Sequence, residues 1–170
     1  MDREHMAPPD QIIEPGTRYQ ATLETDRGTV TIRLLPEAAP RTVANFLHLA
    51  RQSFYDGLTF HRVVDGFVVQ GGCPRGDGAG GPGYQFPDEP VVGDYGPGSV
   101  AMANSGRDTN GSQFFISTVD NRGRLAKSYN LFGQVETGMD VVRQIKVGDR
   151  MRSVSISEEA STEATARGGL

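Results

Sequence analysis

Two stretches near the start of the chain alternate apolar with polar residues. Their apolar positions are Tyr19, Ala21 and Leu23 in the first stretch and Val30, Ile32 and Leu34 in the second. Side chains of a strand point alternately to its two faces, so this period of two predicts strands with one buried face. The Asp-Arg-Gly turn at 26–28 joins them, and residues 17–35 are therefore predicted to form a hairpin.

A longer apolar period marks two helices. After Pro40, which suits a first helical turn, apolar residues recur at helical spacing through about Arg51. The same spacing over residues 138–147 predicts a second, later helix. Short apolar runs predict the remaining strands, at 60–70 with a turn at Asp65-Gly66, at 99–104, 113–118, 131–135 and 152–156.

The pattern divides the chain into three parts. Residues 1–16 contain three prolines and little periodicity and are expected to form an irregular lead. Residues 17–156 are predicted to form one domain, and the small polar residues 157–170 a disordered tail. Many strands with two helices far apart predict a mainly β fold, an antiparallel barrel whose open ends the helices cover. The Gly-rich and Pro-rich segment 71–98 is expected to be a long loop, and both a functional and a disordered loop remain open.

Composition restricts the partners and the compartment. The chain has 17 Lys and Arg against 21 Asp and Glu, scattered without a basic stripe, which disfavours nucleic acid as a partner. Cys73 is the single cysteine, and no signal-like apolar run precedes residue 16, so a cytoplasmic protein is expected. No stretch approaches the roughly 20 apolar residues of a membrane span. The absence of an exposed heptad or a long apolar edge favours a monomer.

Local motifs for cofactors have simpler explanations. A G-x-G-x-x-G pattern occupies residues 78–83, but Pro82 and the residues that follow do not begin a helix, so a turn-rich loop is expected instead of a dinucleotide site. The Asn-Gly-Ser sequon at 110–112 is expected to be a tight turn. No metal site or cofactor is expected, because the candidate ligands lack the short spacing of zinc sites; they are His5, His48, His61 and Cys73.

The most specific pattern lies in two segments. Residues 60–72 are FHRVVDGFVVQGG, and residues 101–118 are AMANSGRDTNGSQFFIST. From its neighbours alone, Arg62 is a strong donor beside apolar residues, and both a solvated strand residue and a functional group remain open. Together with YDGLTF at 55–60 and LFG at 131–133, these segments resemble the cyclophilin family over about residues 17–156.

The resemblance implies a closed eight-stranded antiparallel barrel capped by two α-helices, and a peptidyl-prolyl cis/trans isomerase that assists protein folding. It implies a catalytic set of Arg62, Phe67, Gln70 and Asn104. It implies substrate-binding roles for His61, Val68, Ala103, Gln113, Phe115, Leu125 and Tyr129. Within these sets Phe67, Val68, Phe115 and Leu125 match the apolar walls around the substrate proline. His61 matches a histidine for which structural and functional roles remain open.

Two positions depart from many eukaryotic members of the family. Arg124 stands where they have a tryptophan, and Tyr129 where they have a histidine, as in the bacterial branch. The resemblance therefore implies that cyclosporin binds weakly, while the expected partners are proline-containing peptides and unfolded or flexible protein segments. A binding module or holdase chaperone that grips proline segments, with incidental catalysis, is the alternative function.

Overall fold

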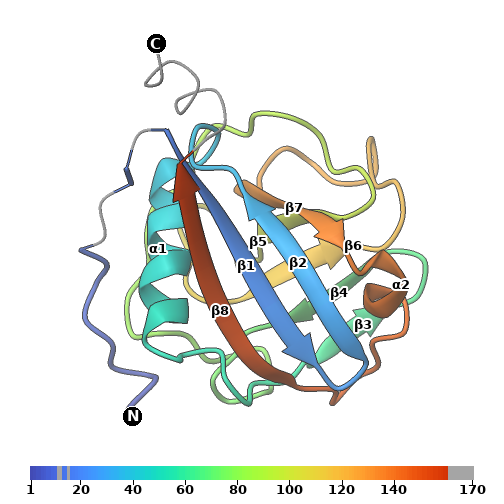
Figure 1. The fold of residues 1–170 in the computed structure, drawn as a ribbon, viewed down its shortest axis with the longest axis horizontal. Coiled ribbons are helices and arrows are strands. Elements are labelled where there is room, and N and C mark those ends of the chain that lie inside the picture. Colours follow the sequence, from blue (N-terminus) through green and yellow to red (C-terminus); the bar gives the residue numbers. More distant parts are fainter. Residues whose placement is uncertain (11–12, 15, 161–170) are drawn as a thin grey trace.

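The computed structural model describes residues 1–10, 13–14 and 16–160, and Figure 1 shows their arrangement. In chain order the elements are β1 (Thr17–Thr25), β2 (Gly28–Leu34), α1 (Pro40–Arg51), β3 (Arg62–Val64), β4 (Val68–Gly71), β5 (Ser99–Met102), β6 (Phe114–Ser117), β7 (Leu131–Thr137), α2 (Met139–Val142) and β8 (Met151–Ala160). Helix α1 contacts β8 and α2 contacts β2, and the two helices lie on opposite sides of the view in Figure 1.

The strands of the described chain form one antiparallel sheet in the order β3-β4-β6-β5-β7-β2-β1-β8. No ladder joins the end strands β3 and β8, so the closed barrel expected from the sequence is wrong, and the sheet is an open half-barrel. All three residues of β3 pair with β4. Within the described chain, only an isolated antiparallel bridge, between Thr59 and Arg150, joins the segments that precede β3 and β8, and the backbone hydrogen bonds around it include Gly57 N to Met151 O (2.7 Å) and Phe60 N to Asp149 O (2.8 Å).

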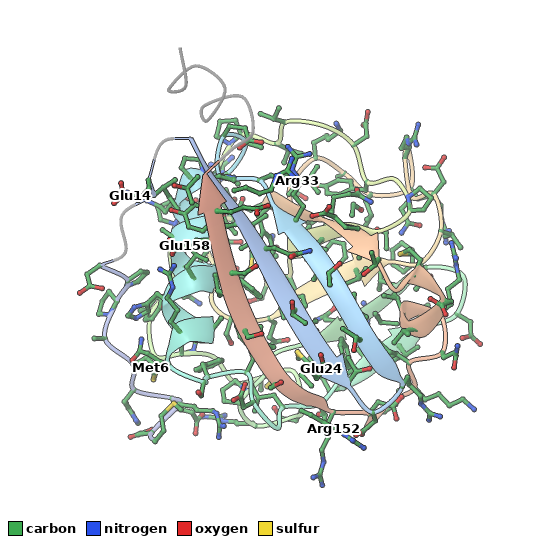
Figure 2. The ribbon with its side chains drawn as sticks, in the orientation of Figure 1. Met6, Glu14, Glu24, Arg33, Arg152 and Glu158 are labelled. Carbon is green, nitrogen blue, oxygen red and sulfur yellow. The ribbon has the colours of Figure 1, made fainter. Side chains whose placement is uncertain are left out.

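The predicted hairpin is confirmed. Strands β1 and β2 pair from Gln20 opposite Arg33 to Thr25 opposite Gly28. All six apolar positions of the alternating pattern are buried, none more than 2% exposed. Polar residues between them, such as Glu24 and Arg33, are exposed on the other face (Figure 2).

The first helix has the predicted bounds, and the second is shorter than predicted. Helix α1 begins at Pro40 and ends at Arg51. Helix α2 covers only Met139–Val142 of the predicted 138–147, because the next hydrogen bonds, such as Ile145 N to Val142 O (3.2 Å), span three residues instead of four.

The described residues at both ends of the chain make contacts that the sequence did not predict. Strand β8 continues to Ala160, so residues 157–160 belong to the sheet and not to a tail. Pairing with β1, for example Tyr19 with Glu158, supplies the backbone hydrogen bonds whatever the side chains are. The rest of the predicted tail, 161–170, lies outside the described residues. The described part of the lead is irregular, as expected, but Arg3 donates to Phe54 O (2.7 Å).

An aromatic group holds α1 against the sheet. Phe46 on α1 lies with its ring centroid 5.2 Å from Tyr55, 5.7 Å from Phe114 and 5.4 Å from Phe132. All four side chains are at most 1% exposed. The main core therefore lies between α1 and the inner face of the sheet.

Replacing Phe46 by Ala is expected to lower the free energy of unfolding by about 3–5 kcal/mol, because it removes buried aromatic area and leaves a cavity. Urea unfolding followed by circular dichroism measures this loss. Val64→Ala, at a side chain 36% exposed, is the control and should change stability by about 0.5 kcal/mol or less. A loss below about 1 kcal/mol in Phe46→Ala would contradict the assigned role of this group.

Candidate active site

A second apolar cluster lies apart from the main core. Its buried members are Val68, Tyr95, Ala101, Phe115 and Leu131, and its half-buried members are Phe67, Val91, Ala103, Leu125 and Tyr129. The outer cluster exists because strands β5 and β6 are buried on both faces. On β6, Ile116 faces the main core and Phe115 the outer cluster, as the strand period requires.

Six residues predicted from the sequence meet in this outer cluster, namely Phe67, Val68, Ala103, Phe115, Leu125 and Tyr129. Phe115 and Tyr129 make an edge-to-face contact with centroids 5.5 Å apart. Because several members are only half-buried, the outer cluster presents apolar surface to solvent. Such a surface can take an apolar ring from a ligand.

A row of polar side chains borders the outer cluster. Arg62 on β3 pairs with Gln70 on β4, which pairs with Phe115 on β6. A guanidinium N–H of Arg62 donates to Gln70 Oε1 (3.2 Å), and Gln70 Nε2 donates to Gln113 Oε1 (3.3 Å). The strand register thus places a charged donor beside the apolar surface.

The Arg62 guanidinium keeps most of its hydrogen-bonding capacity for a ligand. It is exposed, and its hydrogen bond to Gln70 uses one of five N–H groups. No carboxylate of the described residues forms an ion pair with it. A cation in this state can donate to a group brought against the outer cluster.

Other residues predicted to be catalytic or substrate-binding lie next to this row. Ala103 N donates to Gln113 O (3.0 Å). Asn104 joins two loops, since its Nδ2 donates to Ser128 O (2.9 Å) and its Oδ1 accepts from Gly106 N (3.2 Å). The structure therefore brings Ala103, Asn104 and Gln113 together with Gln70.

His61 differs from the other predicted residues. It is half-buried, and its Nδ1 is buried without a hydrogen-bond partner. Burial lowers the pKa of His61, the nearby Arg62 lowers it further, and Asp77 acts in the opposite direction. His61 is therefore neutral at pH 7, which leaves Arg62 as the cation of this pair.

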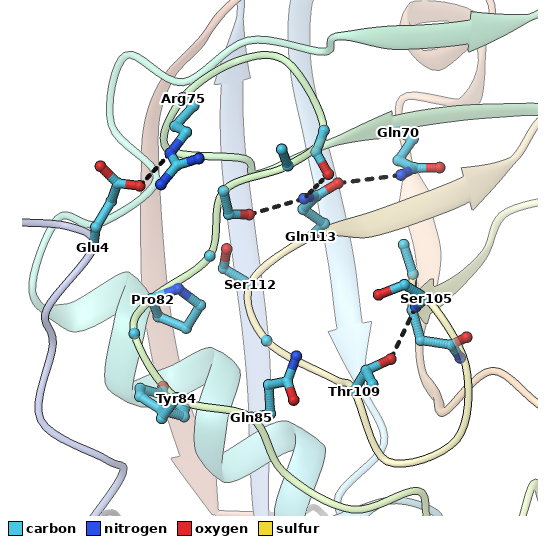
Figure 3. Close-up of a pocket in the computed structure, with 18 of the residues that line it drawn as sticks. Glu4, Gln70, Arg75, Pro82, Tyr84, Gln85, Ser105, Thr109, Ser112 and Gln113 are labelled. Atoms are coloured by element: carbon cyan, nitrogen blue, oxygen red, sulfur yellow. Dashed lines mark hydrogen bonds and ion pairs between the residues drawn. The ribbon is translucent and has the colours of Figure 1, made fainter.

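A cavity of about 720 Å³ adjoins the polar row (Figure 3). Gln70, Ala103, Asn104 and Gln113 line one part of it. The Gly-rich loop lines another part, and its Gly78 and Gly80 carbonyls each accept from Gln113 Nε2 at 2.9 Å. No helix begins at Gly83, so this loop lacks the helix N-terminus that a dinucleotide phosphate requires.

Sequence reasoning missed the buried groups that hold the outer cluster in place. Asn121, which is fully buried, donates from Nδ2 to Phe67 O (3.0 Å). Tyr95 Oη donates to Tyr129 O (2.6 Å) and accepts from Tyr129 N (3.1 Å). Neither residue belongs to a motif, and only the fold brings each to its partner across tens of residues.

The structure also accounts for the sequon and for other kinds of site. Asn110 is fully buried, and its amide donates to Phe86 O (3.1 Å) and Asp88 Oδ1 (2.8 Å), so it is inaccessible to glycosylation in the fold. Within residues 1–10, 13–14 and 16–160, no three His, Cys, Asp or Glu side chains gather as metal ligands. Neither helix found there has the length and apolar character to cross a bilayer.

Comparison with known proteins identifies the family of this chain. Residues 20–164 match the model of the cyclophilin type peptidyl-prolyl cis-trans isomerase family. A peptidyl-prolyl cis-trans isomerase of Synechococcus elongatus is 47% identical over 144 residues, which cover 84% of this chain and 99% of that protein. Peptidyl-prolyl cis-trans isomerase B of Bacillus subtilis is 46% identical over 133 residues, 77% of this chain and 92% of that protein.

Solved structures show the same fold. A crystal structure of a cyclophilin type isomerase of Cryptosporidium parvum superposes with a TM-score of 0.77 at 28% identity, covering 82% of this chain and 98% of that one. The same protein in the presence of the dipeptide Ala-Pro gives a TM-score of 0.75, over 81% and 98% of the two chains. The family match, the level of identity and the shared fold agree, and this chain belongs to the cyclophilin-type peptidyl-prolyl cis-trans isomerases, enzymes that interconvert the cis and trans forms of X-Pro peptide bonds.

Proposed function

We propose that Arg62 lowers the rotational barrier of the X-Pro bond while the outer cluster holds the proline ring. The observation that carries this proposal is the position of Arg62 at the end of the polar row beside the outer cluster, where no carboxylate of the described residues pairs with it. Phe67, Val68, Phe115 and Leu125 form the ring-binding wall.

Resonance is the barrier that the enzyme must overcome. Rotation about a peptide bond costs about 18–20 kcal/mol, because the C–N bond has partial double-bond character. In the twisted state the prolyl nitrogen recovers its lone pair and becomes a good acceptor. An N–H of Arg62 directed at that nitrogen binds the twisted state more strongly than either planar state, which is the requirement for catalysis.

Arg62 supplies only part of the rate enhancement. An acceleration of roughly 10⁶-fold corresponds to about 8 kcal/mol, whereas one preorganised donor contributes about 3–4 kcal/mol. The remainder comes from fixing the ring in the outer cluster and from anchoring the substrate backbone. Gln70, Asn104 and Gln113 supply the anchoring donors and acceptors, and Ala103 and Tyr129 complete the contact surface.

The substrates are proline-containing peptides and flexible or unfolded protein segments. The Ala-Pro dipeptide present with the Cryptosporidium parvum relative supports a proline ligand for this fold. A monomer suffices in this proposal, since every assigned residue lies in one chain. A cytoplasmic location is consistent with the buried thiol of Cys73, which needs no disulfide partner.

Replacing Arg62 by Ala is expected to lower kcat/KM on an X-Pro peptide by about 10²–10³-fold, because the transition state loses its donor. A protease-coupled isomerisation assay measures the change. Arg33→Ala, at an exposed arginine of β2, is the matched control and should leave kcat/KM unchanged. An unchanged value in Arg62→Ala would rule out the role of Arg62.

The unaltered chain can be used to test the alternative function, a binding module or holdase. NMR exchange spectroscopy on an Ala-Pro peptide reports binding and cis/trans exchange separately. Enhanced exchange supports the enzyme, whereas chemical-shift changes without enhanced exchange support the module.

The lowered pKa of His61 predicts a loss of stability in mild acid. Because the pKa of the folded state lies below the unfolded value of about 6.5, the unfolded chain binds the proton first. The contribution of His61 to the free energy of unfolding is complete above pH 6.5 and decreases as the pH drops toward the lowered pKa. Urea unfolding at pH 7.5 and 5.5 should show a smaller loss in His61→Gln than in the unaltered chain.

NMR provides a direct check of the same expectation. The His61 Hε1 resonance should titrate with a midpoint below 6.5, and a midpoint at or above 6.5 would contradict it. Carboxyl groups of the described residues whose pKa is lowered start from a value of 3.8, so they affect a more acidic range; they are Asp2, Asp26, Asp77, Asp94 and Asp149.

Arg124 is the basis of weak cyclosporin binding in this proposal. Its guanidinium carbon lies 4.9 Å from the Phe67 ring centroid, and Nη1 donates to Gly66 O (2.9 Å). A charged, hydrated group therefore covers the rim where an apolar ligand would make contact.

Arg124→Trp is expected to tighten cyclosporin binding by about tenfold, the range of a buried tryptophan contact. Isothermal titration calorimetry measures the affinity. Arg124→Ala separates removal of the charge from the gain of the indole and should give a smaller change. If Arg124→Trp does not improve the affinity for cyclosporin, the contact at the rim does not limit binding.

A further inference from the structure

The lead forms a wall of the cavity beside the active site. Glu4 and His5 line this cavity together with Arg75 and the Gly-rich loop. In Figure 3 the Glu4–Arg75 ion pair lies on one side of the cavity, and Gln70 and Gln113 lie on another. A ligand held by the polar row therefore has the lead as a neighbour.

Backbone contacts fix the lead on the Gly-rich loop. Met6 N donates to Pro82 O (2.8 Å). A Cβ on Gly83 would collide with the carbonyl oxygen of Glu4, and the φ of Gly83 is +95°, so both space and conformation require glycine there. This loop accommodates the lead closely.

Side chains fix the lead to the body of the domain as well. Arg3 donates to Phe54 O (2.7 Å) and to Asp56 O (2.8 Å). Farther along, His48 Nε2 donates to Ala7 O (2.9 Å). Residues 3–7 are thus attached at several points and hold Glu4 at the cavity.

The Arg75 guanidinium forms an ion pair with Glu4 and is also influenced by the carboxylate of Asp77, which precedes the lining residue Gly78. Glu4, Arg75 and Asp77 together carry a net charge of −1, from two carboxylates and one guanidinium. Glu4 remains 40% exposed beside the cavity. A positively charged side chain entering here is attracted, and a negatively charged one is repelled.

We propose that Glu4 determines specificity, by favouring substrates with a lysine or arginine next to or near the proline over substrates with an acidic residue there. The inference rests on the proposed function, since the peptide reaches the cavity along Gln70, Ala103, Asn104 and Gln113. The cavity of about 720 Å³ has ample room for a long side chain. Glu4 lies outside the reacting bond and acts on the flanking residue.

The effect should appear mainly in KM. A contact with a flanking side chain is the same in the planar and twisted states, so it contributes to binding without changing the chemical step. Since the wall is solvent-exposed, the discrimination should weaken in salt.

The experiment uses the full chain and a set of peptides. These carry Lys, Ala or Glu, one position at a time, at the two positions before proline and the two positions after it. In the unaltered chain, Lys is expected to exceed Glu in kcat/KM by about three- to tenfold at one or more of these positions. Glu4→Gln should bring that ratio close to one, and Arg3→Ala, which loosens the wall, should lower it. Ala peptides should be turned over equally by all variants.

Glu24→Gln is the matched control, because Glu24 is an exposed glutamate on β1 that accepts from Thr29 and does not line the cavity. It should leave the ratio unchanged. Equal use of Lys and Glu by the unaltered chain, or an unchanged ratio in Glu4→Gln, would overturn the inference while the isomerase role stands. Inactivity toward every peptide would overturn the proposed function and this inference with it.

Discussion

The burial of strands β5 and β6 on both faces is the constraint on which the site depends. Their inner side chains belong to the core under α1, which fixes the sheet. Their outer side chains need a second cover, and loops supply it through Tyr95, Leu125 and Tyr129. Because loops cover this face only in part, apolar surface is left at the rim. In the proposed function, a proline ring binds against this partly covered apolar surface and gains burial without displacing the core.

The polar row restricts the flexibility of the Arg62 side chain. A free guanidinium on a long side chain loses rotamer entropy when it is fixed on a ligand. Arg62 loses less, because strand pairing and its bond to Gln70 already restrict it. Gln70 is in turn held by Gln113, which two loop carbonyls orient. The Gly-rich loop thus supports the donor indirectly, through acceptors directed at an amide.

Local periodicity predicts the hairpin of β1 and β2 and both bounds of α1, because their burial is decided within a few neighbouring residues. It does not predict the open sheet or the end of β8, which depend on pairing between strands far apart in the sequence. The site shows the same division. An ordered string of residues identified the family and predicted its site residues, whereas Asn121 contacts Phe67, 54 positions away, and carries no local signal.

The lead shows why composition is a poor guide to order at a site. Residues 1–16 lack periodicity, which means that they cannot bury enough apolar surface to fold alone. A segment that docks on a finished surface needs only a few good contacts, and here Arg3 and the backbone of Met6 provide them. Such a segment can change its charges without disturbing the core, because its side chains contribute little to the core itself. In our proposal the half-barrel therefore positions the catalytic groups, and the attached segment determines which peptides are preferred.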